Sequence, residues 1–264
     1  MTKTWSFDSD LTQRYTRIRQ KVISDFLDGI NGQIPLQSAI DIGCGVGYFS
    51  KFLWDRGLNI IAVDGRDENA KEGQRRYPEI RFLTRDAEDP TLAALGVFDL
   101  VLCVGLIYHL ENPFRAIRNF YTLTGKVLVV ESVCAPSVQP SLELVDEPPL
   151  DNQGLNYVAF YPTESCLIKM LYRAGFPFVY GFKRLPDEIE FKETRLRKKE
   201  RTMLVASKDQ LNWQGLVLLK EPKRHWDLWA IPESPLRLLV SRIWAFLRRC
   251  RAHFFPRGHG AAKT

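Results

Sequence analysis

The sequence predicts an α/β fold in which a mostly parallel sheet carries helices on both faces. Short apolar runs rich in β-branched residues alternate with helical patterns over residues 38–131, as they do in repeated βαβ units. A glycine-rich segment directly follows the first apolar run, and an acidic residue ends or follows each of the next two. Since ligands of such sheets bind at the carboxyl ends of the strands, these residues predict where the site lies.

The predicted elements follow one another closely along the chain. Apolar residues at helical spacing predict a first helix over 10–30, with Asp10 as its cap. Buried strands are predicted at 38–42, 58–63, 80–84, 98–104 and 126–131, alternating with helices at 46–55, 69–77, 91–95 and 113–123. A helix at 162–174 and a pair of strands at 178–182 and 201–206 complete the pattern.

This order of elements divides the chain into three parts. Residues 1–36 form an N-terminal helical cap, residues 37–207 the α/β domain, and residues 208–264 a basic C-terminal extension. Within the domain, residues 133–161 form a long connection with four prolines. Connections of that length in a compact domain are usually functional or mobile, so we expect a substrate lid there.

Positive charge is concentrated towards the C-terminus. Residues 192–264 hold 17 Lys and Arg against 6 Asp and Glu, a net charge of +11 in a chain of net charge +6. Residues 236–255 predict an amphipathic helix with arginines on its polar face. Such a segment suits an anionic membrane face or RNA. The alternatives are a solvated surface, or docking of the apolar face on the domain or on a second copy in a homodimer.

Cysteine usage bounds the compartment and the metal chemistry. The five cysteines are scattered, without a CxxC pair or a Cys/His cluster, so neither a disulfide framework nor a metal site is expected. The first residues lack an apolar signal region, and no run reaches the ~18 apolar residues of a spanning helix. We expect a cytoplasmic protein, and peripheral contact with the inner membrane face is compatible with that expectation.

The segment Asp41-Ile-Gly-Cys-Gly-Val-Gly47 joins a predicted strand to a predicted helix. Its glycines allow a sharp turn and let a ligand approach the main chain. Dinucleotide binding needs a glycine where this chain has Tyr48, counting from Gly43, or Ser50, counting from Gly45. No Gly-Lys-Ser/Thr follows, so a Walker phosphate loop is also excluded. Taken alone, the segment could be a tight turn without a ligand.

Three acidic residues at strand ends sharpen this interpretation. Asp41 precedes the glycines, where it could receive an ammonium group through backbone or water. Asp64 ends the second strand, and its carboxylate could accept two ribose hydroxyls. Asp86 follows the third strand and could accept a hydrogen bond from an adenine amino group. Each could instead cap a helix, but capping does not explain all three at successive strand ends.

With these residues in place, the sequence resembles the class I S-adenosylmethionine (SAM) dependent methyltransferases. The resemblance rests on AIDIGCGVGYFSKFL, IIAVDGRDENA, RFLTRDAED and FDLVLCVGLIYHLENP. It implies a Rossmann-like fold with a seven-stranded sheet whose last strand is antiparallel. It also implies that SAM is held by Asp41, Gly43, Gly45, Gly47, Asp64, Gly65, Asp86, Ala87, Val104 and Gly105.

Three further residues are candidates for the chemistry. His109 follows the fourth strand at the mouth of the crevice and could act as a general base, or it could pack in a turn. Tyr108 could stack on the acceptor or bond to it, or simply pack at the rim. Glu131 ends the fifth strand and could bind substrate or accept a proton, or it could form a salt bridge.

These residues predict a methyltransferase acting on a hydroxyl or amine of a small-molecule, sugar, glycan or secondary-metabolite acceptor. One alternative is an RNA acceptor. The Tyr108-His109 pair, Tyr161-Pro162-Thr163 and Arg201-Thr202 loosely resemble enzymes that modify the wobble uridine of tRNA. A second alternative is a SAM-binding or interaction protein without turnover, against which the intact glycine segment and the three acids argue.

Overall fold

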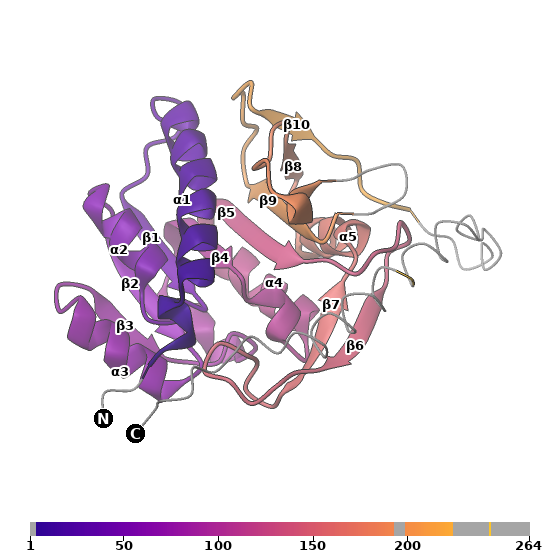
Figure 1. The fold of residues 1–264 in the computed structure, drawn as a ribbon. Coiled ribbons are helices and arrows are strands. Elements are labelled where there is room, and N and C mark those ends of the chain that lie inside the picture. The colour runs from indigo at the N-terminus through magenta and orange to yellow at the C-terminus, as the bar shows by residue number, and fades with distance from the viewer. Residues whose placement is uncertain (1–3, 193–198, 224–242, 244–264) are drawn as a thin grey trace.

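The computed structural model describes residues 4–192, 199–223 and 243, and its central feature is a twisted sheet of eight strands (Figure 1). Along the sheet the strands follow the order β10-β8-β9-β5-β4-β1-β2-β3. The bounds of these strands are β1 (Ser38–Ile42), β2 (Asn59–Asp64), β3 (Arg81–Thr84), β4 (Phe98–Val104), β5 (Thr124–Val133), β8 (Phe178–Phe182), β9 (Arg201–Ser207) and β10 (Leu216–Leu218).

Five neighbouring strands, β5, β4, β1, β2 and β3, run parallel. Strand β9 lies antiparallel between β5 and β8, and β10 pairs antiparallel with β8. The predicted class, a mostly parallel sheet with an antiparallel strand near one end, is confirmed, and β10 extends the seven predicted strands to eight. Because the five strands are parallel, their carboxyl ends meet at one edge of the sheet.

Helices cover both faces of this sheet. The core on one face contains buried side chains of α1 and α2, and the core on the other contains side chains of α4 and α5. The helices are α1 (Asp10–Ile30), α2 (Tyr48–Asp55), α3 (Asp67–Arg76), α4 (Pro113–Leu123) and α5 (Glu164–Ala174), with 3-10 turns η1 (Ser6–Asp8), η2 (Pro90–Leu95), η3 (Ile107–His109) and η4 (Ile189–Phe191). The predicted cap of α1 is wrong by one residue, because the side chain of Ser9, not Asp10, accepts the backbone N–H of Thr12.

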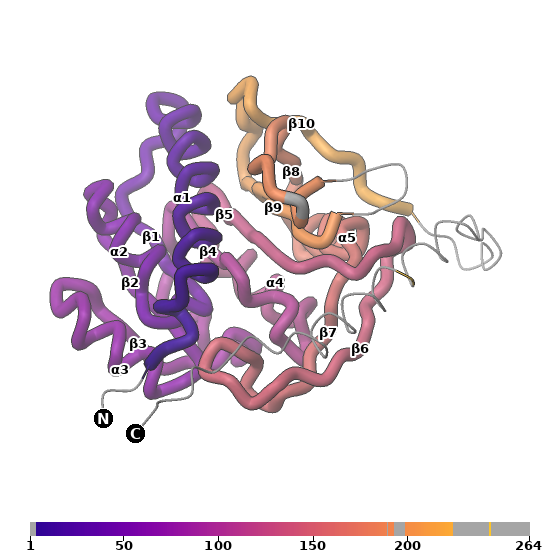
Figure 2. Tube along the Cα trace, viewed as in Figure 1, coloured from indigo at the N-terminus to yellow at the C-terminus, as the bar shows by residue number. Residues whose placement is uncertain are grey.

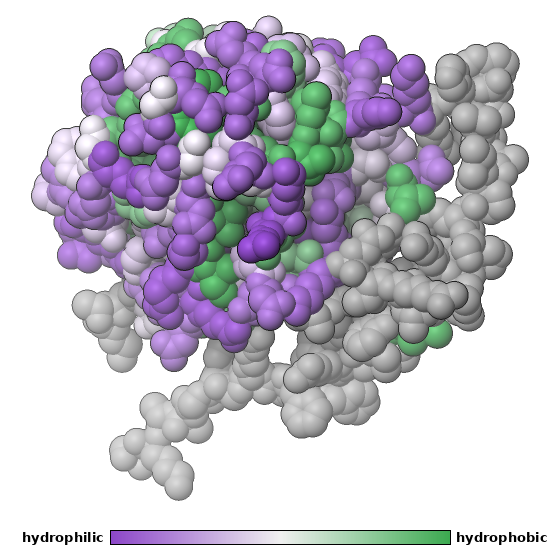
Figure 3. Space-filling model, turned by 90° about the horizontal axis from the view of Figure 1, so that it is seen from above, coloured by the Kyte–Doolittle hydropathy of each residue, from purple (hydrophilic) through white to green (hydrophobic). Residues whose placement is uncertain are grey.

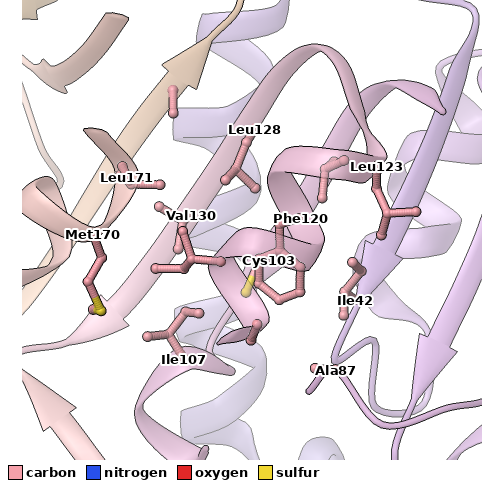
Figure 4. Packing of buried hydrophobic residues seen from close by; sticks show 14 of the residues in the cluster. Ile42, Ala87, Cys103, Ile107, Phe120, Leu123, Leu128, Val130, Met170 and Leu171 are labelled. Atoms are coloured by element: carbon pink, nitrogen blue, oxygen red, sulfur yellow. The ribbon is translucent and has the colours of Figure 1, made fainter. Parts of the chain in front are cut away.

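Strand β5 shows how one strand serves both cores. Its side chains alternate between the two faces of the sheet. Leu128 and Val130 belong to the core beneath α4 and α5, and Val127 and Val129 belong to the core beneath α1. Figure 4 shows the ring of Phe120, from α4, close to Leu128, Val130 and Cys103.

A separate two-stranded hairpin lies within the segment predicted as a lid. Strands β6 (Leu142–Asp146) and β7 (Val158–Pro162) pair antiparallel. The residues between them, 147–157, are called the lid loop below. Figure 2 shows that this loop passes along the lower edge of the molecule towards α3 and returns to β7. It therefore lies at the edge where the parallel strands end.

Part of the predicted C-terminal extension packs on the domain. Leu211 and Leu216 are buried, and the Trp213 ring lies 5.9 Å from that of Phe26 on α1. The amphipathic helix predicted at 236–255 lies outside the described residues, except for residue 243. None of the helices described combines the length and the apolar character that crossing a membrane requires. Seen from above, hydrophilic residues cover most of the described surface, with hydrophobic ones in small groups (Figure 3).

We predict that Phe120→Ala lowers the free energy of unfolding by about 3–5 kcal/mol, because the ring is fully buried and its removal leaves a cavity. Urea denaturation measures this change. Val97→Ala is the control: its side chain is 67% exposed, so the expected change is below about 0.5 kcal/mol. Similar losses for the two variants would contradict the packing described for α4.

Candidate active site

Two connected hollows lie at the carboxyl ends of the parallel strands. The first hollow, with about 580 Å³ of open space, is bounded by the ends of β1, β2 and β4 and by the lid loop. The second, with about 1200 Å³, lies between α1, the end of β4 and the start of β9. Both are lined by Gly43, Gly105 and His109, so they meet where β1 and β4 end.

The glycine segment forms the floor where the hollows meet. Gly43 lines both hollows, whereas Gly45 and Gly47 do not line either one. Gly45 has a φ of +55°, and a Cβ there would lie 2.5 Å from the ring of Phe7. The left-handed backbone and the packing of Phe7 on the loop therefore both require glycine at this position.

Asp64 organises the first hollow. One carboxylate oxygen accepts the backbone N–H of Gly45 at 2.8 Å, and the other accepts the N–H of Arg66 at 2.9 Å and the amide of Asn69 at 3.1 Å. Burial raises the pKa of Asp64, and the two backbone N–H groups oppose that rise. A carboxylate offers about four acceptor positions, so about one is left for a ligand in the hollow that Asp64 lines.

Asp41 does not line either hollow. Its side chain is 2% exposed and accepts the hydroxyl of Ser50, on α2, at 2.6 Å. Burial raises the pKa of Asp41 to about 7, the hydrogen bond from Ser50 opposes that rise, and the charge of Asp64 adds to it. The side chain of Asp41 therefore lies beneath the loop, and its expected role, receiving a ligand ammonium through backbone or water, stays a prediction.

The other predicted cofactor residues are divided between the hollows. Gly65, Asp86 and Ala87 line the first hollow, together with His109. Val104 lines the second. One Asp86 oxygen already accepts the backbone N–H of Glu88 at 2.9 Å, so Asp86 caps its own turn as well as facing the hollow. Both interpretations weighed for this residue are thus compatible with its geometry.

Gly105 marks the passage between the hollows. Its φ is +80°, and a Cβ built there would make only ordinary van der Waals contacts. The nearest atoms to that position are the Tyr108 hydroxyl at 3.7 Å, Arg19 Nη1 at 3.8 Å and Glu131 Oε2 at 3.9 Å. Hydroxyl, guanidinium and carboxylate groups from three elements therefore converge on one point beside the passage.

Glu131 is fully buried and partly unsatisfied. Its Oε1 accepts a hydrogen bond from Arg201 at 3.0 Å and lies 3.6 Å from Arg19 Nε. Its Oε2 has no hydrogen-bond partner among the described residues, and neither does Arg19 Nε. Buried polar atoms are rarely left unpaired, so both mark a place for ligand atoms or water. The salt bridge considered for Glu131 is present, and Oε2 is free for a second role.

His109 is held by a residue of the lid loop. Its Nδ1 lies 2.6 Å from Glu147 Oε1, and the side chain of Glu147 is only 1% exposed. The ring of Tyr108 lies 4.1 Å from the imidazole and makes an edge contact with Tyr161. Within the described chain, no hydrogen bond is made by Nε2 of His109. That nitrogen is therefore available to a ligand, since the residue lines both hollows.

The lid loop is tied across the first hollow. Arg66 donates to the carbonyls of Gln153 and Gly154, at 3.2 and 2.7 Å. Asn69 donates to the carbonyl of Asp151 at 3.1 Å, and Asp151 accepts the N–H of Ser6 at 3.1 Å. The predicted lid segment thus closes over the end of β2 and the start of α3, and not over the second hollow alone.

Comparison with known proteins places this site in a family. Residues 40–126 match a family model described as a methyltransferase domain. Residues 40–126 are therefore similar to the domain of class I SAM-dependent methyltransferases. The matched range contains the glycine segment, Asp64, Asp86 and His109, so it covers the floor of both hollows. It does not include the lid loop or the start of β9.

The curated relatives that this chain matches align with only part of it. The ubiquinone biosynthesis O-methyltransferase of a Caulobacter species is 29% identical over 128 residues, 46% of this chain and 51% of that protein. The tRNA U34 carboxymethyltransferase of Actinobacillus succinogenes is 24% identical over 203 residues, 72% of this chain and 57% of that protein. The chain thus spans about half the length of the curated relatives it matches.

Several solved structures share the fold of this chain. The N-terminal domain of EvdMO1 with SAH bound has a TM-score of 0.57 and 20% identity, and the match covers 71% of this chain and 80% of that one. Magnesium protoporphyrin IX methyltransferase from Synechocystis, with bound SAM, has a TM-score of 0.51 and 19% identity, covering 79% and 86%. At these identities the comparison bears on the fold alone.

The chemistry of the residues at this site fits the groups that SAM carries. At the first hollow, Asn69 Oδ1 is buried without a hydrogen-bond partner in the described chain, beside the carboxylate of Asp64. At the passage, Glu131 Oε2 and Arg19 Nε are likewise buried without a hydrogen-bond partner in the described chain. Acceptors at one end suit ribose hydroxyls, and an acceptor with a donor at the other suits an amino acid's ammonium and carboxylate.

Several residues of this site were not predicted from the sequence. They come from segments far from the glycine loop: Phe7, Arg19, Arg66, Asn69, Glu147 and residues 151–155. Arg201 was noted only as part of a loose resemblance. Of these, only Asn69 carried a local signal, since a polar residue five positions after a strand-end acid can reach back to it.

We predict that Gly105→Ala weakens binding of the product S-adenosylhomocysteine (SAH) about tenfold or more. The added methyl enters the passage, and overpacking of this kind typically costs about 1–3 kcal/mol. Isothermal calorimetry measures the affinity. Gly57→Ala is a matched control, because Gly57 has a φ of +85° with nothing within 4 Å of its Cβ position. Equal affinities for Gly105→Ala and the control would place the ligand elsewhere.

We predict that Asp41→Asn stabilises the protein more at pH 8 than at pH 5. The folded-state pKa of about 7 lies above the ordinary value of 3.8, so the folded state binds more protons between these values and loses stability as the pH rises through them. Asparagine removes that loss. The difference between variant and wild type should widen by at least about 1 kcal/mol in urea denaturation, and exposed Asp25→Asn should show no such widening.

Proposed function

We propose that this protein transfers the methyl group of SAM to a hydroxyl of a small-molecule acceptor held in the second hollow. The observation that carries the proposal is the passage at Gly105. There the two hollows share the lining residues Gly105 and His109, and nearby buried polar atoms of Arg19 and Glu131 lack hydrogen-bond partners in the described chain. A cofactor in one hollow and an acceptor in the other would meet at this point.

The residues of the first hollow would hold the cofactor along its length. Asp64 and Asn69 would accept the ribose hydroxyls, and Asp86 with Ala87 would face the adenine. At the passage, Arg19 Nε would receive the carboxylate of the amino-acid end and Glu131 Oε2 would face its ammonium. SAM supplies a methyl group that is already activated on a positively charged sulfur, so the protein has mainly to position the acceptor and exclude water.

His109 would act as the general base. Its Nε2 would take the proton of the acceptor hydroxyl as the oxygen bonds to the methyl group, so that no free alkoxide has to form first. The Tyr108 hydroxyl would hydrogen-bond to the acceptor beside Gly105. Glu131 would orient the acceptor or the cofactor and would not compete for the same proton, because Arg201 and Arg19 hold its carboxylate.

The lining of the second hollow favours a polar acceptor of moderate size. Tyr15, Tyr108 and Tyr161 present rings, and Arg19 and Arg201 present guanidinium groups. Such a surface can stack on a phenolic ring or bond to the hydroxyls of a sugar. The Caulobacter relative is an O-methyltransferase, and a structure of the EvdMO1 domain was solved in the presence of SAH and D-fucose; both support a small-molecule acceptor that carries hydroxyl groups.

An RNA acceptor is the second candidate, and one observation favours it. The tRNA U34 carboxymethyltransferase match extends over 72% of this chain, against 46% for the ubiquinone biosynthesis relative. The net charge of +11 over residues 192–264 would suit RNA. Most of that charge lies outside the described residues, so the lining of the second hollow weighs more heavily here.

Further proposals concern the setting of the enzyme. We propose a cytoplasmic location, with the basic residues 236–255 contacting either an anionic membrane face or a second copy of the chain. Liposome sedimentation of the full chain and of a version lacking residues 234–264 separates these two outcomes. Unchanged pelleting after the deletion would exclude the membrane contact.

The acceptor class can be tested by methyl transfer from labelled SAM to a cell extract divided into RNA and small-molecule fractions. Label in the small-molecule fraction is the expected result. Label confined to RNA would replace the first proposal by the second. SAH binding without label in either fraction would favour a SAM-binding protein without turnover.

We predict that His109→Asn lowers methyl transfer by about 10²- to 10⁴-fold, which is the usual contribution of a general base. Asparagine can still donate to Glu147 but offers no nitrogen in the place of Nε2. SAH affinity, measured by calorimetry, should fall by far less than methyl transfer, since Asp64, Asn69, Asp86 and Ala87 would still hold the cofactor. Methyl transfer at the wild-type rate would exclude His109 as the base.

A further inference from the structure

The side chain of Glu147 bridges the imidazole of His109 and the lid loop. Oε1 lies 2.6 Å from His109 Nδ1, and Oε2 accepts the backbone N–H of Gly154 at 2.7 Å. The backbone of Glu147 is itself fixed, because its N–H donates to the carbonyl of Tyr157 at 2.7 Å. A carboxylate with 1% of its side chain exposed thus uses one oxygen for each partner.

This geometry decides which nitrogen of the imidazole carries the proton. A carboxylate accepts hydrogen bonds and donates none, so Nδ1 must be the donor in the contact with Glu147. In the neutral ring, Nε2 then holds the lone pair. Nε2 is also the nitrogen without a hydrogen bond inside the described structure. The contact therefore leaves the accepting nitrogen free at the boundary of the two hollows.

The same contact links the imidazole to closure of the first hollow. Gly154 lies against the backbone carbonyl of His109, which would collide with a Cβ at that position. The Gly154 carbonyl in turn accepts from Arg66 at 2.7 Å, beside Asp64. Glu147 can therefore reach His109 and Gly154 together only while the lid loop lies across the first hollow.

We propose that Glu147 is a positioning residue that holds His109 in the tautomer protonated at Nδ1, and that it does so only when the lid loop is closed. The inference rests on the proposed role of His109 as general base. A closed lid would then mean two things at once: the cofactor is covered, and the imidazole presents a lone pair to the acceptor. An open lid would leave the ring free to adopt either tautomer.

The substitution Glu147→Gln separates the two contacts. The amide oxygen of glutamine can still accept the N–H of Gly154, but the amide nitrogen that then faces His109 is a donor. Nδ1 must become the acceptor, so the proton moves to Nε2 and the lone pair at the passage is lost. In serine proteases, exchanging the orienting carboxylate for an amide imposes the wrong tautomer in the same way, with a loss of about 10⁴ in turnover.

The test is ¹⁵N NMR of the full chain labelled in histidine, with the signal of His109 assigned through His109→Asn. Wild type should show His109 protonated at Nδ1, and Glu147→Gln should show it protonated at Nε2. Glu143→Gln is the matched control, since Glu143 lies on the same hairpin with an exposed side chain, and its spectrum should match wild type. Wild type protonated at Nε2, or no change in Glu147→Gln, would overturn the proposal.

Calorimetry with SAH tests the link to the lid. Glu147→Gln should bind SAH within about twofold of wild type, because the bond to Gly154 is kept. Glu147→Ala loses that bond and should bind SAH about 3- to 10-fold more weakly, as expected for one hydrogen bond. Equal weakening in both variants, with both folded by circular dichroism, would reject the separate roles of the two oxygens.

These measurements are distinguishable from a failure of the proposed function. The tautomer is read without cofactor or acceptor, so it can switch as expected even if no methyl transfer is found. Conversely, methyl transfer by wild type with no tautomer change in Glu147→Gln would keep the enzyme and remove the role of Glu147.

Discussion

The carboxylate of Asp64 is the constraint on which the arrangement of the site depends. It receives N–H groups from Gly45, Arg66 and Asn69, and so it joins the glycine loop to the start of α3. Arg66 and Asn69 then bind the lid loop through three of its carbonyls. Burying a carboxylate costs free energy unless it accepts hydrogen bonds. The hydrogen bonds to Asp64 therefore hold these donor groups in place.

The chain of contacts continues from that carboxylate to the imidazole. The lid loop carries Glu147, and Glu147 holds His109, which lines both hollows. Residues distant in the sequence thus act as one unit, from the end of β2 through the lid to the turn after β4. This explains why the lid loop has ordered backbone contacts although it belongs to neither sheet core.

Much of the fold and the floor of the site could be predicted from local pattern. The apolar runs predict β1 to β5. The glycines and Asp64 stand at strand ends in the sequence, and a parallel sheet brings those ends together at one edge. Asp41 shows the limit: its place in the motif suggested contact with a ligand, but its side chain turns towards Ser50 and is buried. Sequence order does not say to which face of a loop a side chain points.

The walls of the site could not be predicted, because they are built from long-range contacts. Arg19 and Arg201 meet at Glu131 from α1 and β9, and Glu147 reaches His109 across 38 positions. None of these contacts has a fixed spacing in the chain. Each pairing depends on how the cap helix, the hairpin and the last strands pack against the sheet.

The contact between Ser6 and Asp151 has a consequence for the catalytic cycle. Phe7 lines both hollows and covers Gly45, and the neighbouring N–H of Ser6 donates to Asp151 of the lid loop. The N-terminal turn and the lid therefore meet over the first hollow from opposite directions. In the proposed enzyme, a spent cofactor that left the hollow past this junction would have to part the two segments, and the contact would then lengthen its residence time.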